Sequence, residues 1–138
     1  MILAERMKRS IARRNDEVFV RSEFAKLGSE AQVSRALKEL VTSGVIVKLG
    51  VGVYAKAKRS VLSGAAIPVK PVDVLAPIAL MKLGVTVYPS KNMQKYNAGE
   101  TTQIPAGNVL NTGGRRIARK LGFGRQTIRY ENNNSVAG

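Results

Sequence analysis

The 138-residue sequence contains no cysteine and no histidine, and its aromatic residues are limited to four tyrosines and three phenylalanines. These absences exclude disulfides, the usual structural zinc sites, thiol catalysis and an imidazole general base. Acidic residues are also few, and the nine carboxylates are scattered along the chain. A phosphate-binding glycine loop of the Walker type is missing too. We therefore expect a protein that is not an enzyme and that carries no cofactor.

Long hydrophobic runs are missing as well. The longest nearly uncharged run, residues 72–81, is interrupted by Asp73 and Pro77 and is too short to cross a bilayer. The apolar residues at the N-terminus give way to charge at Glu5, so we expect no signal peptide. These features predict a cytoplasmic protein without a membrane partner.

Positive charge is what the sequence has in excess. The 23 Lys and Arg residues give a formal net charge of +14 and a pI near 10.7. Thirteen basic and six acidic residues lie in residues 1–60, and ten and three follow, so each half carries +7. A polyanion is the expected partner; nucleic acid is the commonest one, and a membrane surface is the second choice.

Apolar periodicity in the first sixty residues predicts helices. Residues 2–14 have apolar residues at helical spacing with basic residues between them, and residues 18–20 form a short β-prone run. A second helix is expected over residues 21–27, because Gly28 supplies a stop after it. The third helix, over residues 29–43, follows at once, so the two helices meet across one Gly-Ser turn.

The third helix has the clearest pattern. Ser29 and Gln32 have the spacing of a capping box. One continuous apolar stripe follows at helical spacing: Val33, Ala36, Leu37, Leu40 and Val41. Two strand-like runs then flank residues 50–52, where glycines allow the positive φ of a tight hairpin. A helix-turn-helix followed by a β-hairpin predicts a winged helix-turn-helix domain of three helices and a hairpin wing over residues 1–60.

The second half has weaker patterns. A stretch rich in Gly, Ser and Pro predicts a linker over residues 61–71. Beyond it we expect a small α+β domain with antiparallel hairpins over residues 72–131 and a disordered tail over residues 132–138. Its helices are expected over residues 72–83 and 90–98. Its strands are expected over residues 85–88, 101–104, 108–112, 115–118 and 126–131, with Gly113-Gly114 as a hairpin turn. The predicted fold class of the whole chain is α+β.

Two groups of segments carry a family resemblance: residues 29–40 (SEAQVSRALKEL), 43–47 and 50–54 in the first half, and residues 96–99 (YNAG), 101–105 (TTQIP) and 115–117 in the second. The first group resembles the N-terminal winged helix of the AbiEi-like antitoxins, which belong to type IV abortive-infection toxin–antitoxin systems. The second group resembles the other domain of that family. The resemblance covers roughly residues 5–131. It implies a repressor that binds its own operator and antagonises a separately encoded nucleotidyltransferase-like toxin, without the need for a stable complex with that toxin.

Candidate DNA contacts follow from the docking of a helix-turn-helix, whose second helix enters the major groove. The base-contact candidates lie on that helix outside the apolar stripe: Gln32, Ser34, Arg35 and Lys38. The phosphate-contact candidates lie at the helix start, after the first helix and on or after the hairpin: Ser29, Arg14, Lys48, Lys56, Lys58 and Arg59. A second basic patch is predicted in the other half: Arg115, Arg116, Arg119, Lys120 and Arg125.

These basic residues also fit other interpretations. Each candidate could belong to an ordinary solvated face, and the second patch could be an exposed basic hairpin, a second polyanion site or a toxin-antagonising surface. The preferred function is a double-stranded DNA binder that acts as transcriptional repressor and antitoxin. The alternatives are an RNA-binding module, against which the few aromatics count mildly, and a protein-interaction module that neutralises a toxin directly.

Overall fold

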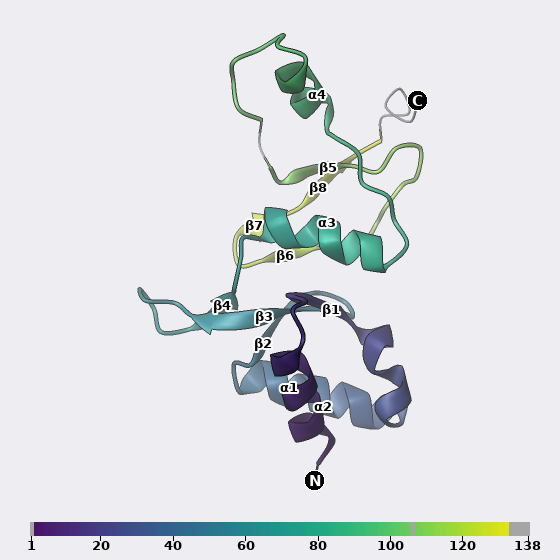
Figure 1. Cartoon of the computed structure of the whole chain (residues 1–138), viewed down its shortest axis with the longest axis vertical. Coiled ribbons are helices and arrows are strands. Elements are labelled where there is room, and N and C mark those ends of the chain that lie inside the picture. Colours follow the sequence, from purple (N-terminus) through teal and green to yellow (C-terminus); the bar gives the residue numbers. More distant parts are fainter. Residues whose placement is uncertain (1, 106, 133–138) are drawn as a thin grey trace. The chain divides into compact units, whose positions relative to one another are not determined.

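The computed structural model, which describes residues 2–105 and 107–132, is an α+β protein (Figure 1). The chain forms two compact units, unit 1 (Met1–Pro71) and unit 2 (Val72–Gly138). The segment expected as a linker, residues 61–71, lies within unit 1, where it contributes a strand. The tail expected over residues 132–138 lies outside the described residues, apart from Asn132. In the described part, no helix is both long and apolar enough to cross a membrane.

Unit 1 contains every element that the periodicity of the first sixty residues predicts. In chain order they are α1 (Leu3–Arg13), β1 (Val18–Val20), η1 (Arg21–Leu27), α2 (Glu30–Thr42), β2 (Ile46–Gly50) and β3 (Val53–Arg59). The segment η1 is a 3₁₀ helix rather than an α-helix. A further strand that the sequence analysis did not predict, β4 (Ala66–Pro68), follows β3.

The sheet of unit 1 has the strand order β1-β3-β2, with β4 pairing with a further part of β3. β2 and β3 are joined by the two-residue turn Val51-Gly52, in which Gly52 has a φ of +71°. This left-handed conformation favours glycine, as a tight hairpin requires. β1 pairs with the same part of β3, so that Val20 lies opposite Val53 at the turn.

The helices bury their apolar stripes in one core. α1 contributes Met7 and Ile11, and α2 contributes the stripe that its spacing predicts. On the sheet, Phe19, Ile46 and Tyr54 belong to the same core cluster. The alternate residues of the strands, such as Val47 and Ala55, are buried as well. This explains why the strand sequences read as continuous apolar runs instead of alternating patterns.

Unit 2 differs from its predicted layout. Its elements are α3 (Val72–Lys82), α4 (Lys91–Asn97), β5 (Val109–Asn111), β6 (Gly122–Phe123), β7 (Gln126–Thr127) and β8 (Arg129–Glu131). The two predicted helices are present, and α3 contains Pro77 in its interior. Residues 101–104 and 115–118 form no strands, and residues 85–88 contribute only an isolated bridge between Tyr88 and Asn111.

The pairing in unit 2 also corrects the prediction of a hairpin at Gly113-Gly114. β5 pairs with β8 in a parallel ladder, so no hairpin turn can join β5 to its partner. The antiparallel hairpin of this unit is instead β6–β7, which turns at Gly124 and Arg125. Short strands of two or three residues give no alternation that a sequence pattern could reveal.

Candidate nucleic-acid interface

The start of α2 is fixed by the predicted capping box. Ser29 Oγ accepts a hydrogen bond of 3.1 Å from the Gln32 backbone N–H, and Gln32 Oε1 accepts one of 2.8 Å from the Ser29 N–H. Bidentate recognition of adenine by glutamine needs both the amide oxygen and the amide nitrogen. Because the oxygen of Gln32 already closes the capping box, Ser29 and Gln32 position the helix, and we leave them out of the proposed contacts.

The face of α2 opposite its buried stripe carries one exposed row. Successive residues of an α-helix are about 100° apart, so side chains at i, i+4, i+7 and i+11 fall into line. The α2 row consists of Ala31, Arg35, Lys38 and Thr42, and Ser34 is exposed beside it. Among the described residues, neither Arg35 nor Lys38 has an ion-pair partner. Both cations are therefore available to a ligand along the middle of the helix.

Arg21 was not among the predicted site residues, but the structure brings it to the start of α2. Its Nη2 donates a hydrogen bond of 2.8 Å to the carbonyl of Glu30, and its backbone N–H donates one of 2.9 Å to Gly52 O. Arg21 thus joins the first turn of α2 to the β2–β3 turn. Nothing in the sequence around Arg21 distinguishes it, because this position results from tertiary contacts.

Lys48 lies on β2 close to the same turn. It pairs with Tyr54 across the ladder, and residues directly opposite each other in an antiparallel pair point to the same face. Tyr54 belongs to the core that the helices cover. The exposed side chain of Lys48 therefore lies on the helix-bearing side of the sheet, as expected for a residue that supplements the α2 row.

Arg14 and Lys56 have partners within the protein. Arg14 Nη1 forms a 3.0 Å ion pair with Glu23 Oε1, and its guanidinium carbon lies 5.7 Å from the ring centroids of both Phe19 and Phe24. Lys56 Nζ donates a 2.5 Å hydrogen bond to the carbonyl of Arg14. These contacts clamp the end of α1 to the sheet and η1, so we assign both residues a structural role.

Lys58 and Arg59 are exposed, but they are far along β3 from the β2–β3 turn. A strand rises about 3.3 Å per residue, so Arg59 lies roughly 20 Å from Val53 at that turn. They belong to the β3–β4 hairpin, in which Lys58 pairs with Ile67 and Arg59 with Ala66. A hollow beside this hairpin is lined by both residues and by Thr42 to Gly44 at the end of α2. The two cations therefore lie at the C-terminal end of α2.

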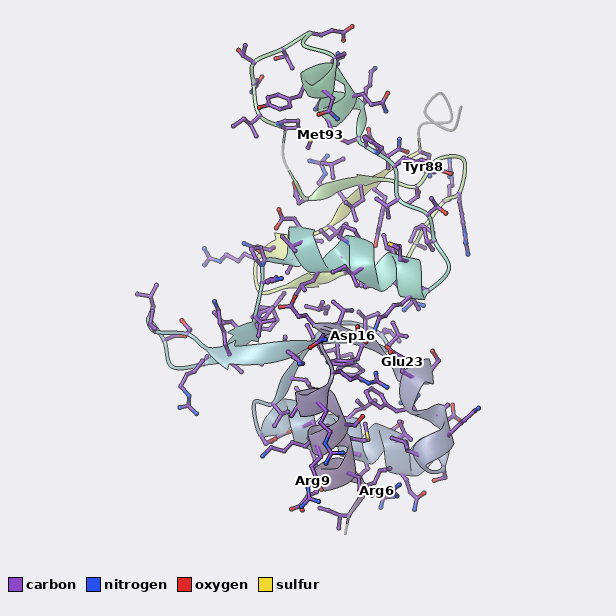
Figure 2. All side chains as sticks on the ribbon, viewed as in Figure 1. Arg6, Arg9, Asp16, Glu23, Tyr88 and Met93 are labelled. Atoms are coloured by element: carbon purple, nitrogen blue, oxygen red, sulfur yellow. The ribbon has the colours of Figure 1, made fainter. Side chains whose placement is uncertain are left out.

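α1 carries a second basic row. Arg6, Arg9 and Arg13 follow the spacing i, i+3 and i+7 and are exposed, whereas Met7 and Ile11 on the other face are buried. Figure 2 shows Arg6 and Arg9 projecting from the helix. This row adds to the positive charge of unit 1, but α1 is not the helix that a helix-turn-helix places in the major groove.

The second basic patch of unit 2 divides between two hollows. Arg115, Arg116 and Arg119 line one hollow, where Arg115 Nη1 also donates a 3.1 Å hydrogen bond to Gly84 O. Arg125 lines another, and Lys120 is exposed but lines neither. All five are exposed. They lie on irregular segments, on the β6–β7 turn and outside any helix face.

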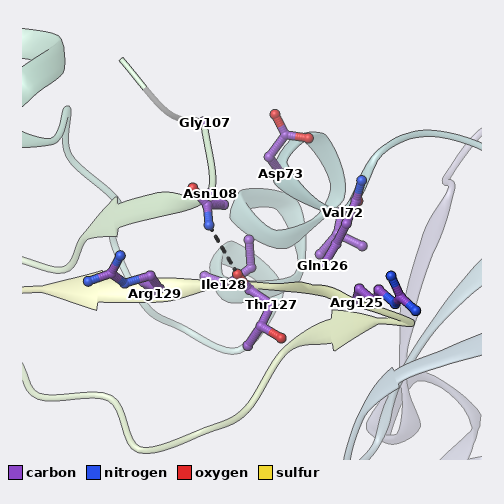
Figure 3. A pocket seen from close by; sticks show the side chains of 9 residues that line it. All are labelled: Val72, Asp73, Gly107, Asn108, Arg125, Gln126, Thr127, Ile128 and Arg129. Atoms are coloured by element: carbon purple, nitrogen blue, oxygen red, sulfur yellow. Dashed lines mark hydrogen bonds between the residues drawn. The ribbon is translucent and has the colours of Figure 1, made fainter.

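The hollow that Arg125 lines has a volume of about 550 Å³ (Figure 3). Its wall combines the carboxylate of Asp73 with the guanidinium groups of Arg125 and Arg129, and Asn108 Nδ2 donates a 3.3 Å hydrogen bond to Thr127 O. This mixture of opposite charges on exposed side chains does not select an anion. In the described residues, no group of three or more His, Cys, Asp and Glu side chains comes together as a metal site would require.

Comparison with known proteins gives one match. Residues 3–136 match a family described as a family of unknown function, DUF6088. No curated protein and no solved structure matches the chain. The match covers both units, and it brings no activity, ligand or partner with it.

Proposed function

The chain belongs to the DUF6088 family, whose function is unknown, and we propose from its unit 1 that it is a winged helix-turn-helix protein that binds double-stranded DNA. The observation that carries the proposal is the α2 row. It presents Arg35 and Lys38, without ion-pair partners among the described residues, on the face of α2 opposite its buried stripe. An exposed helix face of this kind fits the major groove of B-DNA.

The order of elements supports this proposal. Helix, strand, two further helices and a hairpin follow one another, and β1 joins the sheet beside β3. This arrangement is typical of winged helices. In it, α2 is the second helix of the helix-turn-helix, which docks with its N-terminal residues against base edges.

The residues of unit 1 suggest a division of roles. Arg35, which is exposed on α2, would pair with the O6 and N7 of a guanine, and the exposed Ser34 and Lys38 would contact neighbouring bases. Arg21 and Lys48 are near the start of α2 and the β2–β3 turn, where they would contact phosphates and fix the register of the helix.

The biological role that we propose rests on the resemblance of this chain to AbiEi-like antitoxins. The protein would repress its own operon in the cytoplasm and act as the antitoxin of a type IV system, with unit 2 free to oppose a nucleotidyltransferase-like toxin. The basic residues of unit 2 are the candidates for that second task. Identification of the product of the adjacent reading frame tests this role directly.

DNA binding can be tested by selection of a preferred duplex from a random pool, followed by fluorescence anisotropy with the full chain. Arg35→Ala should weaken binding to the selected duplex by about 1–3 kcal/mol and leave binding to random duplex nearly unchanged. Lys95→Ala removes the same charge from an exposed position of α4 and is the matched control. An equal loss of affinity for both duplexes would remove Arg35 as a base-reading residue.

Salt dependence tests the phosphate contacts independently. If Arg21, Lys48, Lys58 and Arg59 neutralise about four phosphates, the logarithm of affinity should fall with the logarithm of salt concentration with a slope of about −3.6. Competition with structured RNA at physiological salt decides between the two nucleic acids. Preferential binding of RNA would overturn the proposal.

A further inference from the structure

The β3–β4 hairpin carries the two most exposed large apolar side chains described in unit 1. Val61 is 99% exposed and Leu62 is 96% exposed, side by side in the chain at the tip of the hairpin. Full exposure of one aliphatic residue is common on protein surfaces. Two adjacent ones on a projecting tip form an apolar area that no described part of unit 1 covers. A ligand that accepts apolar groups is therefore expected at this tip.

The tip is closed by hydrogen bonds within the turn itself. The Ser60 N–H donates to Ala65 O at 2.8 Å, and the Gly64 N–H donates to Ser60 O at 2.9 Å. Ser60 Oγ accepts from the N–H groups of Leu62 and Ser63, at 3.2 and 3.3 Å. Val61 and Leu62 are thus presented on a closed turn, which lowers the entropy cost of placing them against a partner.

The hairpin also projects beyond the rest of the sheet. The ladder of β2 with β3 ends at the pair of Ile46 with Lys56, whereas β3 and β4 continue to the pair of Arg59 with Ala66. In Figure 1 the loop between β3 and β4 extends away from the helices of unit 1. By contrast, the β2–β3 turn, where a winged helix carries its wing, has only two residues.

The charge around the tip indicates the kind of partner. No aspartate or glutamate occurs between Glu39 and Asp73, a stretch that includes the whole β3–β4 hairpin. Lys58 and Arg59 at its base are exposed and have no ion-pair partner among the described residues. These features fit a partner that accepts aliphatic side chains and is negatively charged beside them. The minor groove of DNA meets both conditions, because proteins insert apolar side chains between base steps there and contact the flanking phosphates.

We propose that the tip of the β3–β4 hairpin inserts Val61 and Leu62 into the minor groove of the duplex that α2 binds, an inference that rests on the proposed function. The hairpin leaves the fold beside the C-terminal end of α2, where the ideal Cβ position of Gly44 lies 3.7 Å from the Cβ of Ala66. α2 itself is about 20 Å long, so the hairpin would reach the minor groove that follows the major-groove segment occupied by the helix. Lys58 and Arg59 would contact the phosphates that border it.

The test uses the selected duplex with 2-aminopurine at successive positions of its flanks, because unstacking raises the fluorescence of this base. The wild-type chain should raise the fluorescence at one flanking step. The double variant Val61→Ser with Leu62→Ser should lose that rise and bind about tenfold more weakly. Ile104→Ser, which removes a 78% exposed aliphatic side chain from unit 2, is the matched control. Since Val61 and Leu62 contact no core, the double variant should unfold at the wild-type temperature.

The outcomes separate the two proposals. The Arg35→Ala variant should bind the selected duplex more weakly. At a concentration that saturates the duplex, it should still raise the 2-aminopurine fluorescence at the flanking step. Wild-type binding without unstacking at any flanking position, or a double variant with unchanged affinity and rise, overturns the minor-groove insertion and leaves the proposed function standing. A wild-type chain that binds no duplex overturns both. Co-sedimentation with phosphatidylserine vesicles tests a membrane contact instead. If the wild-type chain co-sediments and the double variant does not, while the double variant still binds DNA like the wild type, the insertion is overturned in favour of a membrane contact.

Discussion

Units 1 and 2 are similar in length and both strongly basic, but their interiors differ in polarity. Unit 1 has 14 Lys and Arg against six Asp and Glu, and unit 2 has nine against three. Unit 1 buries an apolar cluster between two α-helices, η1 and one sheet. Unit 2 also buries apolar side chains, such as Leu75, Leu80 and Ile128, but its strands have only two or three residues, and Asn111 and Thr112 are buried with them, the former completely.

The difference teaches where a chain can be altered without loss of its fold. In unit 1 the polar residues are on the outside of periodic helices, so the α2 row can vary while the buried stripe keeps the fold. In unit 2 a polar side chain is itself part of the interior. Asn111 Nδ2 donates a 3.1 Å hydrogen bond to Pro89 O, and Asn111 Oδ1 accepts one of 2.9 Å from the Gly113 N–H.

The largest effect is expected when this interior amide is removed. Asn111→Ala deletes these two side-chain hydrogen bonds and leaves the buried N–H of Gly113 without this partner, whereas the exposed carbonyl of Pro89 keeps a 3.1 Å hydrogen bond from Gln94 Nε2. A buried polar group left without a partner costs about 1–3 kcal/mol, and the loss of a hydrogen bond to an exposed group costs about 1 kcal/mol, so we expect unit 2 to lose about 2–4 kcal/mol of stability. Because a chain of two units need not unfold in one step, amide hydrogen exchange in each unit is the appropriate measurement.

Asn108→Ala provides the control for this prediction. It removes an amide from the neighbouring segment whose 3.3 Å hydrogen bond to Thr127 O is exposed, and should change stability by less than about 0.5 kcal/mol. Equal protection losses in the two variants would show that the Asn111 amide does not hold unit 2 together. Loss of protection in unit 1 as well would show that the two units do not unfold independently.

A smaller effect is expected from the polar clamp of unit 1. Arg14→Met removes the ion pair with Glu23 and the two cation–π contacts with Phe19 and Phe24, while a long apolar side chain remains. Contacts of this kind at a half-exposed site contribute about 1–2 kcal/mol together, which corresponds to a fall in Tm of roughly 4–16 °C for a unit of this size. Arg13→Met, an exposed change at the end of the same helix, should leave the thermal transition in place.

DNA affinity distinguishes the structural role of Arg14 from a phosphate contact. If Arg14 acts only as a clamp, the Arg14→Met variant should bind the selected duplex with wild-type affinity at a temperature where it is folded. A loss of affinity together with a lower salt slope would instead restore Arg14 as a phosphate contact.

The contrast between the periodic helices of unit 1 and the short strands of unit 2 also explains how much of the fold the sequence predicts. The buried stripe of α2 recurs over three turns, so its helix, its capping box and the outward position of Arg35 and Lys38 could be predicted. β4 could not, because its three residues have no alternation and are ordered by pairing with β3. In unit 2 the parallel pairing of β5 with β8 depends on residues about twenty positions apart, which a local pattern does not reveal.

The candidate site divides in the same way. Exposure follows from periodicity, so the positions of Ser34, Arg35 and Lys38 on α2 were predictable. The partners that a side chain finds within the protein cannot be predicted from periodicity. The ion pair of Arg14 joins residues nine positions apart, and the hydrogen bond of Lys56 to Arg14 O joins residues 42 apart. The same holds for Arg21, whose place beside α2 depends on the turn that β2 and β3 form.

The smallest effect is expected at Tyr130, where unit 2 has a polar atom without a partner. The hydroxyl of Tyr130 is buried and forms no hydrogen bond within the described part of the chain. Desolvation raises the pKa of Tyr130 above its usual value of 10.0, against a smaller lowering by the charge of Arg119. Tyr130→Phe removes a hydroxyl that gains nothing from burial, so stability at neutral pH should be unchanged or higher by at most about 1 kcal/mol.

The effect of Tyr130→Phe on stability should grow at alkaline pH. The folded state keeps the proton of Tyr130 more tightly than the unfolded chain, so the contribution of this group to stability is complete below pH 10 and is lost as the pH rises through the higher folded pKa. Denaturant unfolding of wild type and Tyr130→Phe at neutral pH and above pH 10 should therefore show a growing advantage of the variant. Tyr96→Phe, at an exposed position of α4, controls for the loss of a hydroxyl. If the difference in stability between wild type and Tyr130→Phe stayed constant across this pH range, the phenol of Tyr130 would be hydrated in solution. Unit 2 would then be more open to water at β8 than at the neighbouring β5, where Asn111 and Thr112 are buried.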